Sequence, residues 1–199
     1  MKKALAPFIV ALPLMGLSSV AKADLILLTA TLTGSQEFPP TGSPGIGSGF
    51  FTLDDVTHLF TVNIAFAGLL SPTVASHVHC CTPPGANAIV ATPVPTFPGF
   101  PLGVTTGTYL MTFDLTLASS YNPAFITAHG GTVAGADAAF EAGLVSGLTY
   151  LNIHTSQFPG GEIRGQLSVV PEPGTMMLVG TGLVGMLVFV GKRKRSASS

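Results

Sequence analysis

Residues 58–66 read His-Leu-Phe-Thr-Val-Asn-Ile-Ala-Phe, and this stretch decides the fold class. Large apolar side chains stand at every second position: Phe60, Val62, Ile64 and Phe66. Because successive side chains of a β-strand point to opposite faces, this alternation predicts a strand with only one face in the core. It favours an all-β domain over a helical one.

The composition on both sides of this stretch extends the same prediction. Val, Ile, Thr, Phe, Gly and Pro are abundant and helix formers are few, which favours strands and turns. We expect strands at 25–33, 49–53, 75–80, 88–91, 108–117, 149–154 and 162–169, and one short helix at 134–144. Gly160-Gly161 predicts a hairpin turn. The fold class is therefore expected to be all-β, an antiparallel Greek-key sandwich of immunoglobulin-like or superoxide-dismutase-like type.

Prolines recur throughout residues 82–107, where only 88–91 has the pattern of a strand. They predict a long, stiffened loop, and long ordered loops often carry function.

The two ends of the chain have the composition of targeting segments. Residues 1–23 combine a basic start, an apolar run and the cleavage site Ala21-Lys22-Ala23, which together predict a secretory signal peptide. Residues 175–191 are apolar and uncharged, and the basic residues of 192–195 follow them. A helix over this run spans roughly 26 Å, enough for a transmembrane helix. The basic end would stay in the cytoplasm, so that the region before it is exported.

The charge of the exported region excludes one class of partner. Of the nine acidic residues of the chain, all but Glu172 lie in residues 24–170, and Arg164 is the only basic residue there. Such a surface cannot neutralise phosphates, so no nucleic-acid binding is expected. Neutral glycans, cations and other proteins remain as partners.

Three histidines are the candidate metal ligands. His77 and His79 are two residues apart on a predicted strand, which places both rings on one face, and His154 lies on another predicted strand. Three imidazoles from two strands could hold copper or zinc. The alternative is structural: the rings would tie strands together by hydrogen bonds, with Asn152 and Thr155 as partners.

Cys80 and Cys81 are the only cysteines and are adjacent. In an exported protein they could form a vicinal disulfide or bridge two molecules. They could also serve as thiolate ligands beside His77 and His79, a donor set that suits Cu(I). A redox-catalytic pair is disfavoured because the chain has no C-x-x-C motif.

Glu162 and Arg164 are two apart on the last predicted strand and are expected to share a face. In a structural role Arg164 would pair with Glu162, with Glu37 or with loop carbonyls. In a functional role the arginine would clamp a ligand carboxylate. No catalytic residues are predicted, since G-x-S-x-G, P-loop and H-E-x-x-H motifs do not occur.

The C-terminus resembles a PEP-CTERM sorting signal in its order of features: Pro171, Glu172 and Pro173, the apolar run, then the basic end. The resemblance assigns 170–199 to this signal. It implies export through the Sec translocon, a membrane-anchored precursor, and an exosortase-type sorting enzyme that releases or re-anchors the protein. Such systems occur in Gram-negative bacteria that produce exopolysaccharide, so the expected location is the cell surface or the extracellular space.

Three stretches of residues 24–169 together resemble the CHRD domain, first named from chordin. They are Leu32 to Pro40, His77-Val78-His79, and Tyr150 to Thr155 with the following Pro159 to Leu167; Asn152, Glu162 and Arg164 belong to the last. The chain departs from the family where Cys80-Cys81 replaces a frequent Gly-Pro. The His-x-His is also locally similar to the copper ligands of copper/zinc superoxide dismutase.

Two functions are compatible with these observations. The first is a non-enzymatic binding or structural role at the cell surface or in the extracellular matrix, with polysaccharide or matrix proteins as partners. The second is a copper- or zinc-binding, superoxide-dismutase-like domain that uses His77, His79 and His154.

Overall fold

The computed structural model describes residues 25–171. The predicted signal peptide, Glu172, Pro173, the predicted transmembrane helix at 175–191 and the basic residues 192–195 lie outside the described residues. The strands are β1 (Leu25–Thr33), β2 (Ile46–Asp54), β3 (Leu59–Ala67), β4 (Thr73–Cys80), β5 (Ile89–Val90), β6 (Gly107–Asp114), β7 (Thr149–Thr155), β8 (Ile163–Gln166) and β9 (Ser168–Val169). The helices are α1 (Pro123–Ala128) and α2 (Val133–Val145), with short 3₁₀ turns η1 (Gly34–Gln36) and η2 (Ala118–Ser120).

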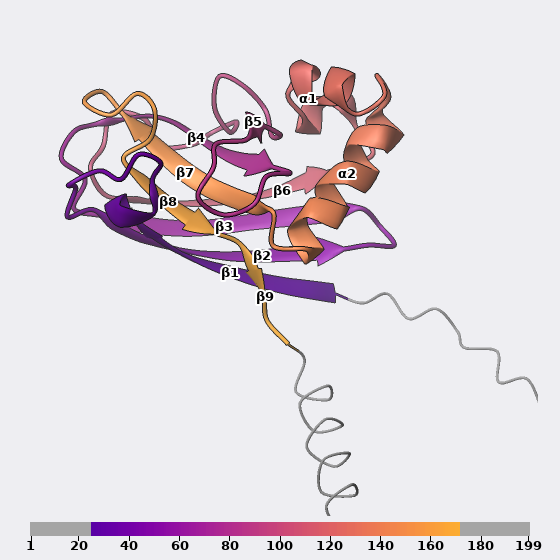
Figure 1. Cartoon of the computed structure of the whole chain (residues 1–199), viewed down its shortest axis with the longest axis horizontal. Helices are drawn as coiled ribbons and strands as arrows, with labels where there is room; N and C mark the ends of the chain where they lie inside the picture. The colour runs from indigo at the N-terminus through magenta and orange to yellow at the C-terminus, as the bar shows by residue number, and fades with distance from the viewer. Residues whose placement is uncertain (1–24, 172–199) are drawn as a thin grey trace, which may run out of the picture.

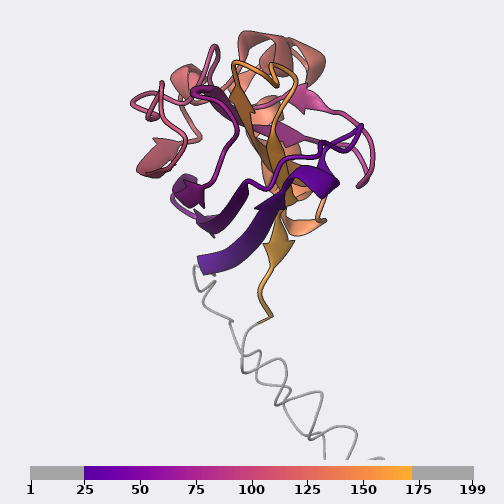
Figure 2. The same ribbon diagram turned by 90° about the vertical axis from the view of Figure 1, so that its left-hand side faces the viewer.

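The strands form one curled sheet in the order β5-β4-β7-β8-β1-β2-β3-β6, with β9 also paired to β1 (Figure 1). Each of the strand pairs is antiparallel. This confirms the all-β, antiparallel class, while the Greek-key type stays a prediction. Seen from the side, the sheet is curled (Figure 2). The start of β1 and the yellow end of the described chain lie close together at the bottom of this view. The hydrogen bond from Val170 N to Leu27 O joins these two ends.

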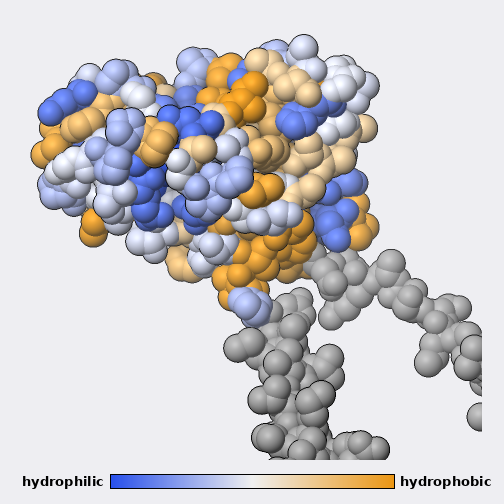
Figure 3. Space-filling view, viewed as in Figure 1, coloured by the Kyte–Doolittle hydropathy of each residue, from blue (hydrophilic) through white to orange (hydrophobic). Residues whose placement is uncertain are grey.

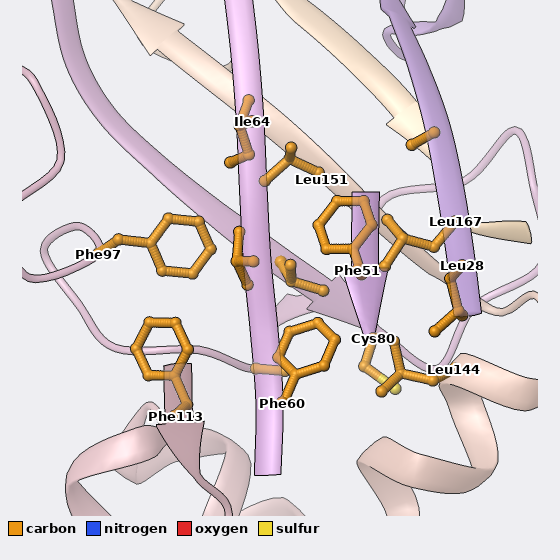
Figure 4. Packing of buried hydrophobic residues seen from close by; sticks show 14 of the residues in the cluster. Leu28, Phe51, Phe60, Ile64, Cys80, Phe97, Phe113, Leu144, Leu151 and Leu167 are labelled. Carbon is orange, nitrogen blue, oxygen red and sulfur yellow. The ribbon is translucent and has the colours of Figure 1, made fainter. Parts of the chain in front are cut away.

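Strand β3 has the two faces that its sequence predicts. Phe60, Val62, Ile64 and Phe66 are at most 3% exposed, whereas Leu59 is 40% exposed on the other face. Phe51 of β2 and Phe113 of β6 extend the buried face across the sheet (Figure 4). The opposite end of the curled sheet contributes Leu151 and other residues of β4, β7 and β8 to the same core.

Two predicted segments differ from the structure. Residues 162–169 form two strands instead of one: β8 pairs with β7, and β9 pairs with β1. Leu167 lies between them, with its N–H donating to Thr149 O and its side chain fully buried. The expectation of a single helix was wrong, since α1 precedes α2 at one end of the sheet (Figure 1). Asn122 caps α1 by accepting from Ala124 N, and Pro123 occupies its first turn. With six residues, α1 is too short to produce a periodic signal.

The proline-rich segment of residues 82–106 folds back over β4. Ala91 N donates to Val78 O and Phe97 N donates to Ser76 O. These bonds hold the loop along the edge of β4, and the carbonyls of Ala88 and Pro95 reach the rings of His79 and His77 on one face of that strand. Within residues 25–171, no helix is both long enough and apolar enough to span a bilayer.

Candidate metal centre

Adjacent strands β4 and β7 bring the three histidines to one face. His77 pairs with Asn152 and His79 with Tyr150, while His154 pairs with Ala75. Paired residues point to the same side of a sheet, so these rings share one polar layer beneath the loop of residues 82–106. His77, His79 and His154 are 7%, 8% and 9% exposed.

Each ring is held by a backbone carbonyl. His77 Nε2 lies 2.7 Å from Pro95 O, His79 Nδ1 lies 2.8 Å from Ala88 O, and His154 Nδ1 lies 2.9 Å from Pro159 O. Because a carbonyl oxygen only accepts hydrogen bonds, these three nitrogens carry the hydrogens. A second partner of this kind fixes the tautomer and orientation of a metal-binding histidine.

The opposite nitrogens therefore carry lone pairs. Burial, followed by repulsion from His154, lowers the pKa of His77 to about 4. Burial likewise lowers the pKa of His79 to about 4 and lowers that of His154. Each ring is thus neutral near pH 7 and has a single N–H, which already donates its hydrogen bond to a backbone carbonyl.

Two of these lone pairs face each other, and the third ring lies beside them. His77 Nδ1 and His154 Nε2 are 3.2 Å apart, and all three rings offer a nitrogen within 4.8 Å of the others. Two nitrogens that bind one zinc ion at tetrahedral angles lie roughly 3.4 Å apart. With no proton left to bridge His77 and His154, a cation would relieve the repulsion between their lone pairs. The arrangement is thus chemically suited to a copper or zinc ion.

A three-layer stack positions His79. Its ring stacks on Tyr150 at 4.6 Å between centroids and 7° between planes, and the Arg164 Cζ atom lies 3.3 Å from the centroid of Tyr150. Asn152 Oδ1 lies 3.1 Å from His79 Nε2, so the side-chain amide borders the same space. Residues of the last sequence motif therefore support the histidine cluster.

Cys80 and Cys81 form a disulfide. Since Cys80 follows His79 directly on β4, its side chain points to the opposite face, into the core beside Leu144 of α2 (Figure 4). Both sulfurs lie near the carbonyl of Ala139 on α2. The structure does not bring them together with the histidines.

Glu162 and Arg164 do not pair with each other. Arg164 donates to Ala86 O at 2.8 Å and to Asn87 Oδ1 at 3.2 Å, so its partners lie in the loop of residues 82–106. Glu162 is fully buried and accepts hydrogen bonds from Ser43 Oγ, Leu70 N and Thr155 Oγ1.

Pro171 is the one residue of the predicted sorting motif that lies within the described residues. It is exposed and follows β9.

Sequence reasoning missed a second cluster, at the end of the sheet that carries the helices. His58 Nδ1 lies 2.9 Å from Asp137 Oδ2 and 3.1 Å from Glu141 Oε1. The two acids are four residues apart on α2, a spacing that places both on one helix face and that could have indicated the cluster. We interpret it as an ion-paired contact that joins the start of β3 to α2.

Comparison with known protein families matches residues 28–167 to the CHRD domain and residues 169–194 to the PEP-CTERM protein-sorting motif. No curated protein matches the chain. No solved structure matches it either. The match to the CHRD domain covers most of the chain and includes all three histidines of the cluster. The protein belongs to the CHRD domain family and carries a C-terminal PEP-CTERM sorting motif.

Proposed function

We propose that this protein is an exported, non-enzymatic protein of the cell surface whose CHRD domain binds one copper or zinc ion through His77, His79 and His154. The observation that carries the proposal is the set of three buried, neutral imidazoles that each offer a nitrogen within 4.8 Å of the others, with the unprotonated nitrogens of His77 and His154 only 3.2 Å apart. Imidazole nitrogen is a preferred donor for both metals.

A superoxide-handling role is the second candidate. The His-x-His on β4 and the facing His154 on β7 would place a redox-active copper ion between two strands. The small residual exposure of each ring favours a small diatomic substrate over a larger one. Turnover of superoxide that depends on bound copper would support this role over pure binding.

The sorting motif supports the proposed location. We propose that residues 1–23 direct export through the Sec translocon and that residues 175–191 anchor the precursor as a transmembrane helix with a cytoplasmic basic end. An exosortase-type enzyme of a Gram-negative bacterium would then recognise Pro171, Glu172 and Pro173 and deliver the domain to the surface or the medium. Polysaccharide or matrix proteins are the proposed partners there.

Nitrogen NMR of the imidazoles tests metal binding at the level of single atoms. On addition of Zn²⁺ to the protein, the ¹⁵N shifts of His77 Nδ1, His79 Nε2 and His154 Nε2 should change to those of metal-bound nitrogen. The nitrogens that donate to Pro95, Ala88 and Pro159 should keep their protons. His129 serves as the internal control.

Unchanged shifts at all three rings with excess Zn²⁺ and Cu⁺ would contradict the proposal and leave the histidines as hydrogen-bonding residues. Changes at His58 alone would place the metal at the ion-paired cluster instead.

Tagging at the C-terminus tests the sorting proposal. In a host that contains an exosortase, the wild-type protein should lose a C-terminal epitope, whereas a Pro171→Ala, Pro173→Ala variant should keep it in the membrane fraction. Equal loss from both proteins would show that the motif is not what the processing enzyme reads.

A further inference from the structure

Glu37 is a buried acid without a hydrogen-bond partner among the described residues. It ends η1, is 6% exposed, and its Oε1 atom is one of two buried side-chain oxygens in residues 25–171 that accept no hydrogen bond. Burial raises the pKa of Glu37 to about 7, against the opposing effect of Arg164. An unpartnered buried carboxyl is costly to the fold, so its position calls for an explanation.

Two open hollows meet at Glu37 and Phe38. The first has a volume of about 410 Å³ and lies between η1 and the turn that follows β7. The second has a volume of about 300 Å³ and lies on the other side of Glu37, beside Arg164. Figure 3 shows this side of the molecule, at the left, mainly in hydrophilic colours with scattered apolar residues.

The hollows are lined mostly by neutral polar side chains and rings. Besides the charged Glu37 and Arg164, the polar residues around them are Ser35, Gln36, Thr41, Asn87, Gln157 and Gln166. Phe38 is 54% exposed and borders both hollows. An exposed aromatic ring beside several amides and one acid offers an apolar platform together with donors and acceptors.

The charges select the ligand class. A cation would meet the guanidinium of Arg164, which lines the second hollow. An anion would meet Glu37 and the excess of acids over bases in the exported region. A neutral ligand rich in hydroxyls avoids both penalties and supplies the O–H donors that the carboxyl lacks.

We infer that the two hollows around Glu37 bind a neutral saccharide, with Glu37 accepting hydrogen bonds from its hydroxyls and Phe38 packing against a sugar ring. The backbone permits this placement because residue 161 is glycine: a Cβ there would collide with the Glu37 carboxyl. The inference rests on the proposed role at the cell surface, for whose polysaccharide partner it supplies a binding site, and it uses none of the three histidines of the metal site.

Titration with neutral sugars tests the inference on the full chain, exported and extracted in a detergent without a sugar headgroup. The probes are glucose, galactose, mannose, and their β-linked and α-linked disaccharides. Saturation-transfer NMR and calorimetry measure their binding. At least one probe should bind, and Glu37→Gln should weaken it by about tenfold or more, since an oxygen that accepts from the sugar is replaced by an NH₂ group that only donates. Phe38→Ala should weaken the same probe.

Controls separate this site from the metal centre. His154→Ala should abolish metal binding and keep sugar binding. Glu37→Gln should keep the metal stoichiometry, and its far-ultraviolet circular dichroism spectrum should match that of the folded wild type. Binding of no probe at about 10 mM, or equal binding by wild type and Glu37→Gln, would overturn the inference. Binding of Ca²⁺ or choline at Glu37 without any sugar would also overturn it.

Discussion

At the scale of single residues, the three histidines differ from ordinary buried histidines in how their hydrogen bonds are distributed. A structural histidine uses one nitrogen as donor and the other as acceptor, whereas here each acceptor nitrogen faces another ring or an amide oxygen. The depressed pKa values remove the extra proton that could bridge His77 and His154. The proposed metal ion would resolve this arrangement by accepting the lone pairs of the three rings.

The depressed pKa values predict an unusual pH dependence of metal affinity. Metal binds the neutral imidazole, and protons compete only near and below the folded pKa. Burial lowers the pKa of all three rings, to about 4 for His77 and His79, so affinity should begin to fall at a lower pH than it would with ordinary histidines, whose pKa is about 6.5. Competition with a chromophoric chelator across this range measures it. A tenfold fall per pH unit that begins near pH 6.5 would contradict the prediction.

Glu162→Gln should destabilise the domain strongly. The buried carboxylate accepts hydrogen bonds from Ser43, Leu70 and Thr155. A neutral amide replaces these charge-assisted hydrogen bonds by weaker ones, and its NH₂ group forces the Thr155 hydroxyl to turn from donor to acceptor. We expect a loss of about 2–4 kcal/mol in the free energy of unfolding. Urea denaturation measures it.

Asp55→Asn is the matched control, since Asp55 is exposed in the turn after β2. It should change the free energy of unfolding by less than about 0.5 kcal/mol. Equal effects of the two substitutions would show that the buried hydrogen bonds of Glu162 have no special weight.

At the scale of elements, helix α2 packs closely on the disulfide of β4. A Cβ at Gly143 would collide with Cys80 Sγ, so the helix approaches the strand only because this position is glycine. The carbonyl of Ala139, one turn earlier, lies near both sulfurs. The disulfide thus forms part of the contact between helix and sheet.

Gly143→Ala should therefore reverse the usual effect of such a change. Alanine normally stabilises a helix interior by about 0.5–1 kcal/mol relative to glycine, but here overpacking should cost about 1–3 kcal/mol. Thermal unfolding measures this, with Ala138→Ser on the exposed face of α2 as the control. In a Cys80→Ala, Cys81→Ala background the penalty should disappear, and its persistence would contradict the proposed contact.

Particular elements show which features could be predicted from sequence. Alternation predicted β3 because one of its faces is buried, and the His-x-His spacing correctly placed two rings on one face of β4. The sequence could not predict that the carbonyls of Ala88, Pro95 and Pro159 hold the rings. Every residue has a backbone oxygen, so residue type does not reveal which one accepts a hydrogen bond. The partners of Arg164 depended on where the loop of residues 82–106 folds back, which only the tertiary structure determines.

At the scale of the whole molecule, metal loading should raise thermal stability. A ligand at about a hundred times its Kd stabilises the folded state by about 2.7 kcal/mol if it does not bind the unfolded chain. For a domain of this size, we expect the Tm to rise by roughly 5–10 °C. Differential scanning calorimetry with and without Zn²⁺ measures the shift. His154→Ala should abolish the shift, and an equal shift in that variant would contradict binding at the cluster.

The metal content of the exported protein tests the central claim most directly. The full chain would be exported to a bacterial periplasm, extracted without chelator or metal-affinity tag, and subjected to elemental analysis before and after copper addition. The account predicts about one copper or zinc ion per chain, lost in His77→Ala and His154→Ala and kept in His129→Ala. A wild-type protein with its fold intact and no stoichiometric metal after copper addition would contradict it.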